Sequence, residues 1–198
     1  MFVCIVIALA VLFTLAPLCN VACARPLDER GVAKLRRSLK PVLSLSETEL
    51  VALVPERSGL YFIGCPNCDG GTQENQISWS IDRPDVVFCR FCDHVYPSEQ
   101  YPDDKVQRVP NPAGGVHEYP YWEAPEPAGR ALRSSVAKYD PRSGYRHFFQ
   151  AKGWFLARKY LADAAEDLAK LYEATGDRAF SRRSALLLNR FAEVYPGY

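Results

Sequence analysis

The fold of this chain is decided by residues 64–96, which read GCPNCDGGTQENQISWSIDRPDVVFCRFCDHVY. The stretch holds two Cys-x-x-Cys pairs, formed by Cys65, Cys68, Cys89 and Cys92. Tetrahedral Zn²⁺ takes four thiolate ligands, and two such turns joined by a strand-rich loop can supply them. Between the pairs, residues 77–81 alternate apolar and polar side chains, as a half-buried strand does. The spacing therefore predicts a zinc-ribbon-like module over residues 59–96, in which these four cysteines bind one structural Zn²⁺.

Two alternatives to zinc remain open for the four cysteines. In an exported protein they can form two disulfides, by bridges that run between the pairs. A bridge inside one Cys-x-x-Cys pair would instead be redox-active, a role that needs a strand–helix context, whereas Asp69-Gly70-Gly71 starts a loop. His94 follows the second pair and could replace one thiolate. With four cysteines present, we interpret it as a surface residue.

The N-terminus predicts export. Residues 2–18 are almost wholly apolar and uncharged, and Ala22-Cys23-Ala24 is a small-residue site of the kind that signal peptidase cuts. We therefore predict a signal peptide over residues 1–24 and a secreted or periplasmic mature protein without membrane attachment. An uncleaved membrane anchor and a lipoprotein at Cys23 are the alternatives. Of the seven cysteines in the sequence, cleavage would remove Cys4, Cys19 and Cys23.

The charge balance gives no indication of a nucleic-acid partner. The formal net charge is +1, and the leader carries no charged side chain, so the mature chain has the same value. A nucleic-acid-binding domain usually presents a strongly basic surface. The basic runs at 34–37 and 182–183 are short and typical of the solvated face of a helix. We predict no nucleic-acid partner.

Helices are expected before the ribbon, over residues 25–58. Three apolar residues fall on one helical face, namely Val32, Leu35 and Leu39. Pro41 interrupts this helix, because proline lacks the N–H that a helix interior needs. Ser46, followed three residues later by Glu49, is a capping-box pattern and predicts the start of a second short helix.

Residues 97–141 are rich in proline and predict an extended surface segment. Proline cannot continue a helix or donate to a central β-ladder, so neither element is expected over most of this length. Tyr119, Tyr121 and Trp122 lie within the segment. They could stack on sugar rings, because aromatic side chains of this kind combine an apolar face with a polar edge. We favour the alternative, in which they anchor the extended segment to the body of the protein.

Residues 142–198 predict an α-helical hairpin. Apolar residues recur at three- and four-residue steps and form a long stripe. Gly176 is expected to end the first helix and Asp177 to cap the second, which Pro196 stops. The stripes are broad enough to need more partner surface than one hairpin offers. The fold class expected for the whole chain is mixed and mainly α, with a zinc-ribbon-like β module followed by this hairpin.

The order of these motifs resembles the N-terminal part of the heparinase II/III-like polysaccharide lyases. The resemblance covers most of the chain from residue 45 onward and is carried by Gly64–Cys68, Cys89–Cys92, Tyr96-Pro97-Ser98, Leu168–Asp177 and Phe191–Pro196. It implies that residues 142–198 begin an (α/α) toroid, which a β-sheet domain follows. It also implies an exported enzyme that cleaves uronic-acid-containing polysaccharide by β-elimination, in which a base removes the C5 proton.

The resemblance assigns no catalytic residue to this sequence. The family's catalytic Asn, His and Tyr lie on toroid helices that would follow Tyr198. His94, His117 and His147 stand in no matching motif, and we interpret His147, at the start of the long helix, as structural. We therefore expect the chain to be an N-terminal fragment of the lyase, inactive alone, with the polysaccharide as the partner of the full-length enzyme.

Three other functions fit parts of the sequence. The main alternative is a non-enzymatic binding or scaffold module, because residues 171–177 also look like the turn of a tetratricopeptide repeat. Against a repeat protein, only one such hairpin is found, whereas repeats recur at a fixed period. A zinc-ribbon nucleic-acid binder is disfavoured by the predicted export and by the charge. A Cys-x-x-Cys oxidoreductase is disfavoured by the loop that follows the first pair.

Overall fold

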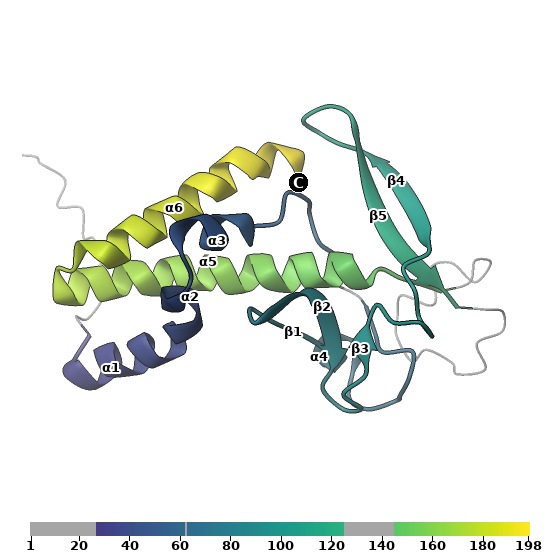
Figure 1. The fold of residues 1–198 in the computed structure, drawn as a ribbon, viewed down its shortest axis with the longest axis horizontal. Coiled ribbons are helices and arrows are strands. Elements are labelled where there is room, and N and C mark those ends of the chain that lie inside the picture. The colour runs from purple at the N-terminus through teal and green to yellow at the C-terminus, as the bar shows by residue number, and fades with distance from the viewer. Residues whose placement is uncertain (1–26, 62, 125–144) are drawn as a thin grey trace, which may run out of the picture.

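One long helix, α5 (Phe149–Thr175), runs through the middle of the protein, and the other elements pack around it (Figure 1). The computed structural model describes residues 27–61, 63–124 and 145–198. These residues form helices and two small antiparallel sheets, so the mixed class is confirmed. The predicted signal peptide lies outside the described residues. Within them, no helix is both long enough and apolar enough to cross a membrane.

The predicted helical hairpin is present. Helix α5 ends at Gly176, whose φ of 71° is left-handed backbone that glycine adopts without a steric penalty. Asp177 then caps α6 (Arg178–Val194) by accepting a hydrogen bond from the backbone N–H of Ala179. A 3₁₀ turn, Tyr195–Gly197, follows α6. The turn chemistry predicted from the sequence is thus confirmed.

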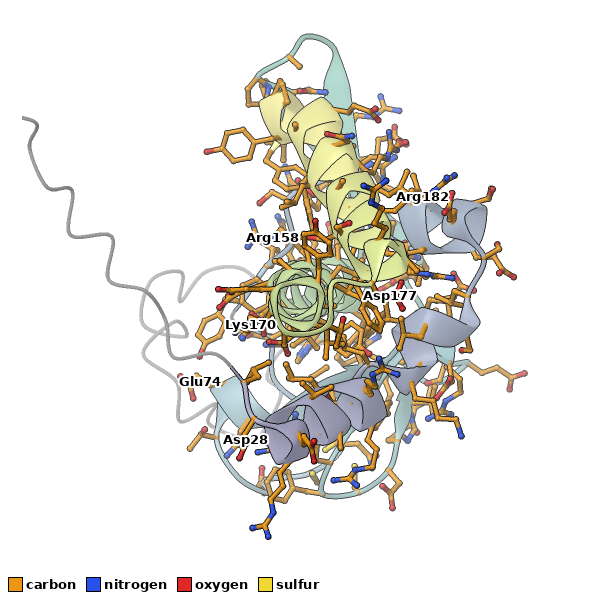
Figure 2. The ribbon with its side chains drawn as sticks, turned by 90° about the vertical axis from the view of Figure 1, so that its left-hand side faces the viewer. Asp28, Glu74, Arg158, Lys170, Asp177 and Arg182 are labelled. Atoms are coloured by element: carbon orange, nitrogen blue, oxygen red, sulfur yellow. The ribbon has the colours of Figure 1, made fainter. Side chains whose placement is uncertain are left out.

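From residue 27 onward, three short helices precede the ribbon: α1 (Glu29–Ser38), α2 (Lys40–Ser44) and α3 (Glu47–Ala52). Pro41 stands at the start of α2, where its missing N–H costs no helical hydrogen bond. The capping box is confirmed, because Ser46 accepts from the N–H of Glu49 while the Glu49 carboxylate accepts from the N–H of Ser46. Viewed along α5, helices α1 and α6 lie on opposite sides of it (Figure 2).

The C-terminal half of α5 belongs to an apolar core that we call the helical cluster. Its buried members are Leu39, Val42, Leu50, Val54, Leu161, Ala164, Ala165, Leu168, Leu171, Phe180, Leu187 and Val194. The N-terminal helices therefore cover the stripe of α5 that α6 leaves open. The hairpin does need partner surface beyond its own two helices, as predicted, and segments of the same chain supply it for α5. One hairpin does not by itself define a toroid.

The N-terminal half of α5 packs on the first sheet and its loops. Helix α4 (Gln73–Gln76) leads into β1 (Ile77–Ser80), which pairs antiparallel with β2 (Arg83–Cys89), and β2 pairs with β3 (Val95–Tyr96). In Figure 1 this sheet lies beside the end of α5 at which the helix begins. We call its apolar core the ribbon cluster, made of Ile63, Cys65, Ile77, Val87, Cys89, Tyr96, Tyr101 and Phe149.

The segment before the first cysteine pair crosses directly over α5. The N–H of Leu60 donates to the carbonyl of Ala151 at 3.0 Å. Only glycine fits at position 59, because a Cβ there would lie 2.2 Å from the backbone nitrogen of Phe155. Lys152, which is fully buried, donates from Nζ to the carbonyl of Tyr61 at 2.7 Å. These contacts fix the entry to the ribbon on the helix.

The proline-rich segment is not simply extended, which corrects the prediction for residues 97–141. Strands β4 (Lys105–Pro110) and β5 (Val116–Glu123) form an antiparallel hairpin, and β6 (Arg146–His147) pairs with the end of β5. The order is β4-β5-β6, so β5 is a central strand. Over most of its length, however, β4 is the only strand paired with β5 among the described residues. Alternate N–H groups then face away from the ladder, and a proline such as Pro120 is tolerated there.

The three aromatic residues of this segment anchor it, as the favoured interpretation predicts. The ring of Tyr119 lies 5.7 Å from that of Trp154 on α5, measured between centroids. Tyr121 packs on Phe148 at 5.1 Å, and Trp122 on His147 at 5.2 Å. Each aromatic therefore contacts α5 or the residues just before it. Residues 125–141 of the segment lie outside the described part.

Candidate metal centre

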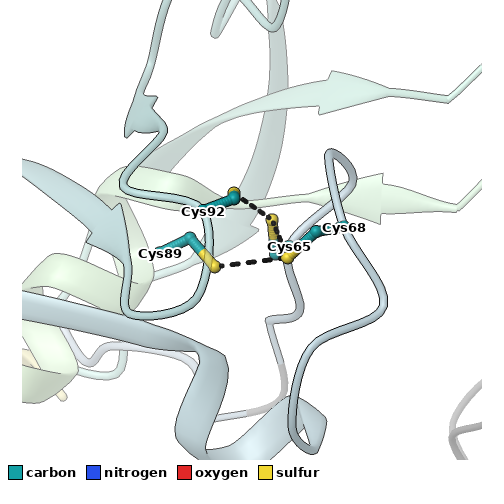
Figure 3. A group of neighbouring side chains, drawn as sticks. All are labelled: Cys65, Cys68, Cys89 and Cys92. Carbon is teal, nitrogen blue, oxygen red and sulfur yellow. Dashed lines mark hydrogen bonds between the residues drawn. The ribbon is translucent and has the colours of Figure 1, made fainter.

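The four cysteines come together from two loops of the ribbon (Figure 3). Cys65 and Cys68 lie on the loop before α4, Cys89 is the last residue of β2, and Cys92 lies in the turn that leads to β3. The pairing of Ile77 with Cys89 brings the start of β1 to the second pair. The Sγ atoms of all four cysteines lie within 4.8 Å of one another. The group can therefore hold one metal ion.

The spacing of the sulfur atoms fits a tetrahedral thiolate site and excludes disulfides in this arrangement. The Sγ–Sγ distances are 3.7 Å for Cys65–Cys92, 3.7 Å for Cys65–Cys68 and 3.6 Å for Cys68–Cys89. A tetrahedron with metal–sulfur bonds of about 2.3 Å has edges of about 3.8 Å. A disulfide bond is far shorter, at about 2.05 Å. All four cysteines are free.

Backbone N–H groups shape the second cysteine turn. The N–H of Phe91 points to Cys89 Sγ at 3.4 Å, and the N–H of Asp93 donates to the Cys89 carbonyl at 3.0 Å. Asp93 has φ 55°, a left-handed conformation that Asp and Asn tolerate better than most residues. The N–H of Cys89 donates to the carbonyl of His94 at 2.9 Å, which closes the turn between β2 and β3. The turn thus aims an N–H dipole at the sulfur of Cys89.

A glutamine that sequence reasoning missed fixes the first turn. Gln76 is 8% exposed, and its Oε1 accepts from the N–H of Cys65 at 2.9 Å. Its Nε2 donates to the carbonyl of Gly70 at 2.7 Å. One side chain therefore holds both ends of the loop that carries Cys65 and Cys68. Nothing in the sequence around Gln76 indicates this role, because the contacts are made across the loop.

Two tyrosines and an asparagine surround the thiols. Tyr96 Oη lies 3.0 Å from Cys65 Sγ, and the Tyr96 side chain is fully buried. Asn67 Nδ2 donates to Cys92 Sγ at 3.5 Å. Tyr101 Oη donates to Asn67 Oδ1 at 3.3 Å. Hydrogen bonds of this kind orient metal ligands and support the charge of a thiolate.

The environment of the thiols is uneven. Burial raises the pKa of Cys65, although the hydrogen bond with Tyr96 acts against this rise. Burial also acts to raise the pKa of Cys92, but hydrogen bonds, above all from Asn67, lower its pKa to about 7. A bound cation removes the cost of burying thiolate charge, because metal binding and deprotonation are linked.

None of the three histidines belongs to this group. His94 Nε2 lies 3.1 Å from Ser98 Oγ, so the alternative of His94 as a ligand finds no support. His117 Nε2 contacts the carbonyl of Gly197 at 2.6 Å. His147 is buried, and its Nδ1 lies 3.2 Å from the carbonyl of Gly64. Burial lowers the pKa of His147 to about 4, which confirms its structural interpretation.

A scan of protein-family models and searches of curated proteins and of solved structures found no match for this chain. The resemblance to heparinase II/III-like lyases therefore depends on the quoted motifs alone. The geometry of the four cysteines is the firmest basis for a function.

Proposed function

We propose that this chain is the zinc-stabilised, non-catalytic N-terminal part of an exported polysaccharide lyase. One Zn²⁺ on Cys65, Cys68, Cys89 and Cys92 holds the ribbon together. The single observation that carries the structural zinc site is the near-tetrahedral spacing of four free thiols. The lyase assignment depends on the order of motifs in the sequence.

The donor set favours zinc in a structural role. Thiolates are soft ligands, and a tetrahedral group of four selects Zn²⁺ or iron over the hard cations Mg²⁺ and Ca²⁺. A catalytic zinc site keeps one position open for water or substrate, whereas four cysteines fill every position. The metal supplies a crosslink between the two loops, and the N–H groups and side chains around it orient the thiolates.

The motif order supports the lyase part of the proposal. The two cysteine pairs, the Tyr96-Pro97-Ser98 motif and the helical hairpin follow one another as in the heparinase II/III-like family. The resemblance assigns the base, the acid and the carboxylate-neutralising residue to helices outside these 198 residues. The role of this chain in the enzyme is then to support the helices that carry them.

A second candidate is a non-enzymatic scaffold or binding module. The observation that favours it is the covered stripe of α5, because α1–α3 and the ribbon supply partner surface from within the same chain. A chain with its own two cores can fold without further helices. The two candidates share the zinc site and differ in what the whole gene product does.

Metal analysis of the secreted chain tests the zinc site. We expect one zinc per chain by mass spectrometry of the metal, four thiols that react only after chelation, and an N-terminus at Arg25. Little metal together with no free thiols would show that disulfides form instead. Iron in place of zinc would correct the identity of the metal.

An activity assay separates the two candidate functions. The complete reading frame, expressed from its natural gene, should release unsaturated uronate, which absorbs in the ultraviolet, from alginate or heparin. The 198-residue chain alone should release none. Product formation by the short chain would overturn its non-catalytic role. A complete gene product without β-elimination activity on any uronic-acid polymer would favour the scaffold.

A further inference from the structure

We propose that Tyr96 is a positioning residue of the metal centre. Through Tyr96, metal binding is coupled to the docking of the N-terminal half of α5, so that the two occur as one cooperative event. The inference depends on the proposed metal site. Tyr96 lies on β3 and has no exposed surface. Its hydroxyl contacts a metal ligand, while its ring contacts the helix. No other described side chain is both within 3.0 Å of a cysteine Sγ and stacked on α5.

The hydroxyl of Tyr96 reaches the first cysteine pair. Its Oη lies 3.0 Å from Cys65 Sγ in a fully buried position. When Cys65 is bound to a metal it is a thiolate, which can only accept, so the phenol is the donor. The same contact therefore orients Cys65 and supports its negative charge.

The ring of Tyr96 reaches α5. It stacks on Phe149 with centroids 4.3 Å apart and planes 10° from parallel. Phe149 is the first residue of α5 and is fully buried. On the strand beside Tyr96, its register partner Val87 faces Gly153 of the same helix. A shift of Tyr96 would thus disturb the sulfur and the first turn of the helix together.

A second route of contacts leads from the other cysteine pair to the same place. Asn67 donates to Cys92 and accepts from Tyr101, whose ring lies 4.9 Å from Trp122. Trp122 in turn packs on His147, two residues before α5. The Nδ1 atom of His147 contacts the carbonyl of Gly64, which is adjacent to Cys65. Both cysteine pairs are therefore connected to the start of α5.

These connections make metal affinity and helix docking mutually dependent. Loss of a hydrogen bond from the shell around a metal ligand typically weakens metal binding by about 10- to 100-fold. Coupling between two equilibria is reciprocal: if docking of the helix end raises metal affinity by some factor, metal binding favours docking by the same factor. The C-terminal half of α5 contacts the helical cluster and takes no part in this coupling.

The test compares Tyr96→Phe with Tyr160→Phe. Tyr96→Phe keeps the ring and removes only the hydroxyl, and we expect zinc affinity, measured by chelator competition, to fall about 10- to 100-fold. The thiolate charge-transfer band of the Co²⁺ form should also shift, because one sulfur loses a donor. Tyr160 packs on Trp79 and is not near the thiols, so Tyr160→Phe should leave both readouts unchanged.

A second variant tests the reciprocal direction without removing a thiol or the Tyr96 hydroxyl. Phe149→Leu should weaken zinc binding, although Phe149 is not a metal ligand, because it removes the ring on which Tyr96 stacks. In the wild type, removal of metal should speed amide exchange over residues 149–157 and leave 161–175 slow. Unchanged affinity in both variants, or exchange that rises evenly along α5, would overturn the inference. A wild-type chain that binds no metal would overturn the proposed zinc site instead.

Discussion

The two halves of α5 differ in what surrounds them. The C-terminal half lies in the helical cluster, where, among the described residues, Ser184 is the only buried polar one, bonded to the carbonyl of Ala165. The N-terminal half carries the buried Lys152 and adjoins the ribbon, where Gln76 and His147 are buried and four thiols lie together. Apolar contacts tolerate small shifts, whereas a buried polar group without its partner is costly. The stability of the helical half thus depends on how much apolar surface it buries. The stability of the ribbon half depends on whether each buried polar group keeps its hydrogen-bond partner.

This difference between the two clusters explains why a metal would stabilise the ribbon end of α5 and not the helical end. The ribbon cluster has fewer buried members than the helical cluster, and its sheet is made of three short strands. A small core of this kind usually needs a disulfide or a metal for stability. The helical cluster gathers side chains from five helices and needs neither. Four predictions test this contrast, in order of decreasing effect.

Loss of one thiol should have the largest effect and should be confined to the ribbon half. Cys89→Ser should abolish stoichiometric metal binding, since structural zinc sites contribute about 10–16 kcal/mol of apparent binding energy. Near-ultraviolet circular dichroism from Trp79 should be lost, while most of the far-ultraviolet helix signal remains. Arg90→Ser, at an exposed site in the same turn, is the control and should keep the metal. Global unfolding of Cys89→Ser would contradict the independence of the helical half.

A cavity in the helical cluster should produce the converse result. Leu168 is fully buried, so Leu168→Ala should lower the free energy of unfolding by about 2–5 kcal/mol. The zinc content should stay at one per chain, because Leu168 does not belong to the ribbon cluster. Leu188→Ala, at a side chain that is 56% exposed, should change stability by less than about 0.5 kcal/mol. Denaturant titration followed by metal analysis checks both variants.

Mild acid should weaken the ribbon half through His147. Burial lowers its pKa from 6.5 to about 4, so between these values the unfolded chain binds a proton that the folded chain does not. Protonation of His147 therefore does not lower the free energy of unfolding above pH 6.5. As the pH drops toward 4, the free energy of unfolding falls by up to about 3 kcal/mol. His147→Gln should flatten this part of the pH profile relative to the wild type.

Comparison of variants removes the effect of acid on the metal itself. Protons compete with metal for thiolates in every variant, so this contribution cancels in the difference between His147→Gln and the wild type when both are measured at saturating zinc. His117→Gln is the matched control, because His117 contacts the carbonyl of Gly197 outside the ribbon cluster. An identical pH profile in His147→Gln would show that the buried imidazole does not affect stability in this range.

Removal of the capping box should give the smallest effect, restricted to the helical half. Ser46→Ala loses the hydrogen bond from the N–H of Glu49 and should lower stability by about 1 kcal/mol. Ser38→Ala, at an exposed residue at the end of α1, should cost less. Thermal unfolding of the two variants decides this prediction, and zinc affinity should be unchanged in both.

The features that could be predicted from the sequence are local. The capping box needs only Ser46 and Glu49, and the hairpin turn needs only Gly176 and Asp177. The four cysteines could be grouped because two tight turns fix each pair and one strand pairing joins them. In each case, residues close in sequence, or a known ligand chemistry, determine the geometry.

The features that could not be predicted depend on contacts between distant segments. The covering of α5 by α1–α3 was missed because an apolar stripe does not indicate which segment will cover it. The β4–β5 hairpin was missed because proline is excluded only from positions whose N–H donates to the ladder, and the sequence does not indicate which positions these are. The roles of Gln76 and Tyr96 depend on where their side chains end after folding.

The uninterrupted length of α5 also determines how the molecule transmits movement. Its 27 residues form a stiff rod of about 40 Å, with the thiols near one end and Gly176 at the other. A rod of this kind acts as a lever, because a tilt of about 5° at the thiol end displaces the far end by about 3.5 Å. Because the far end is packed in the helical cluster, a tilt of this size is resisted there, and that packing holds the thiol end of the rod in place.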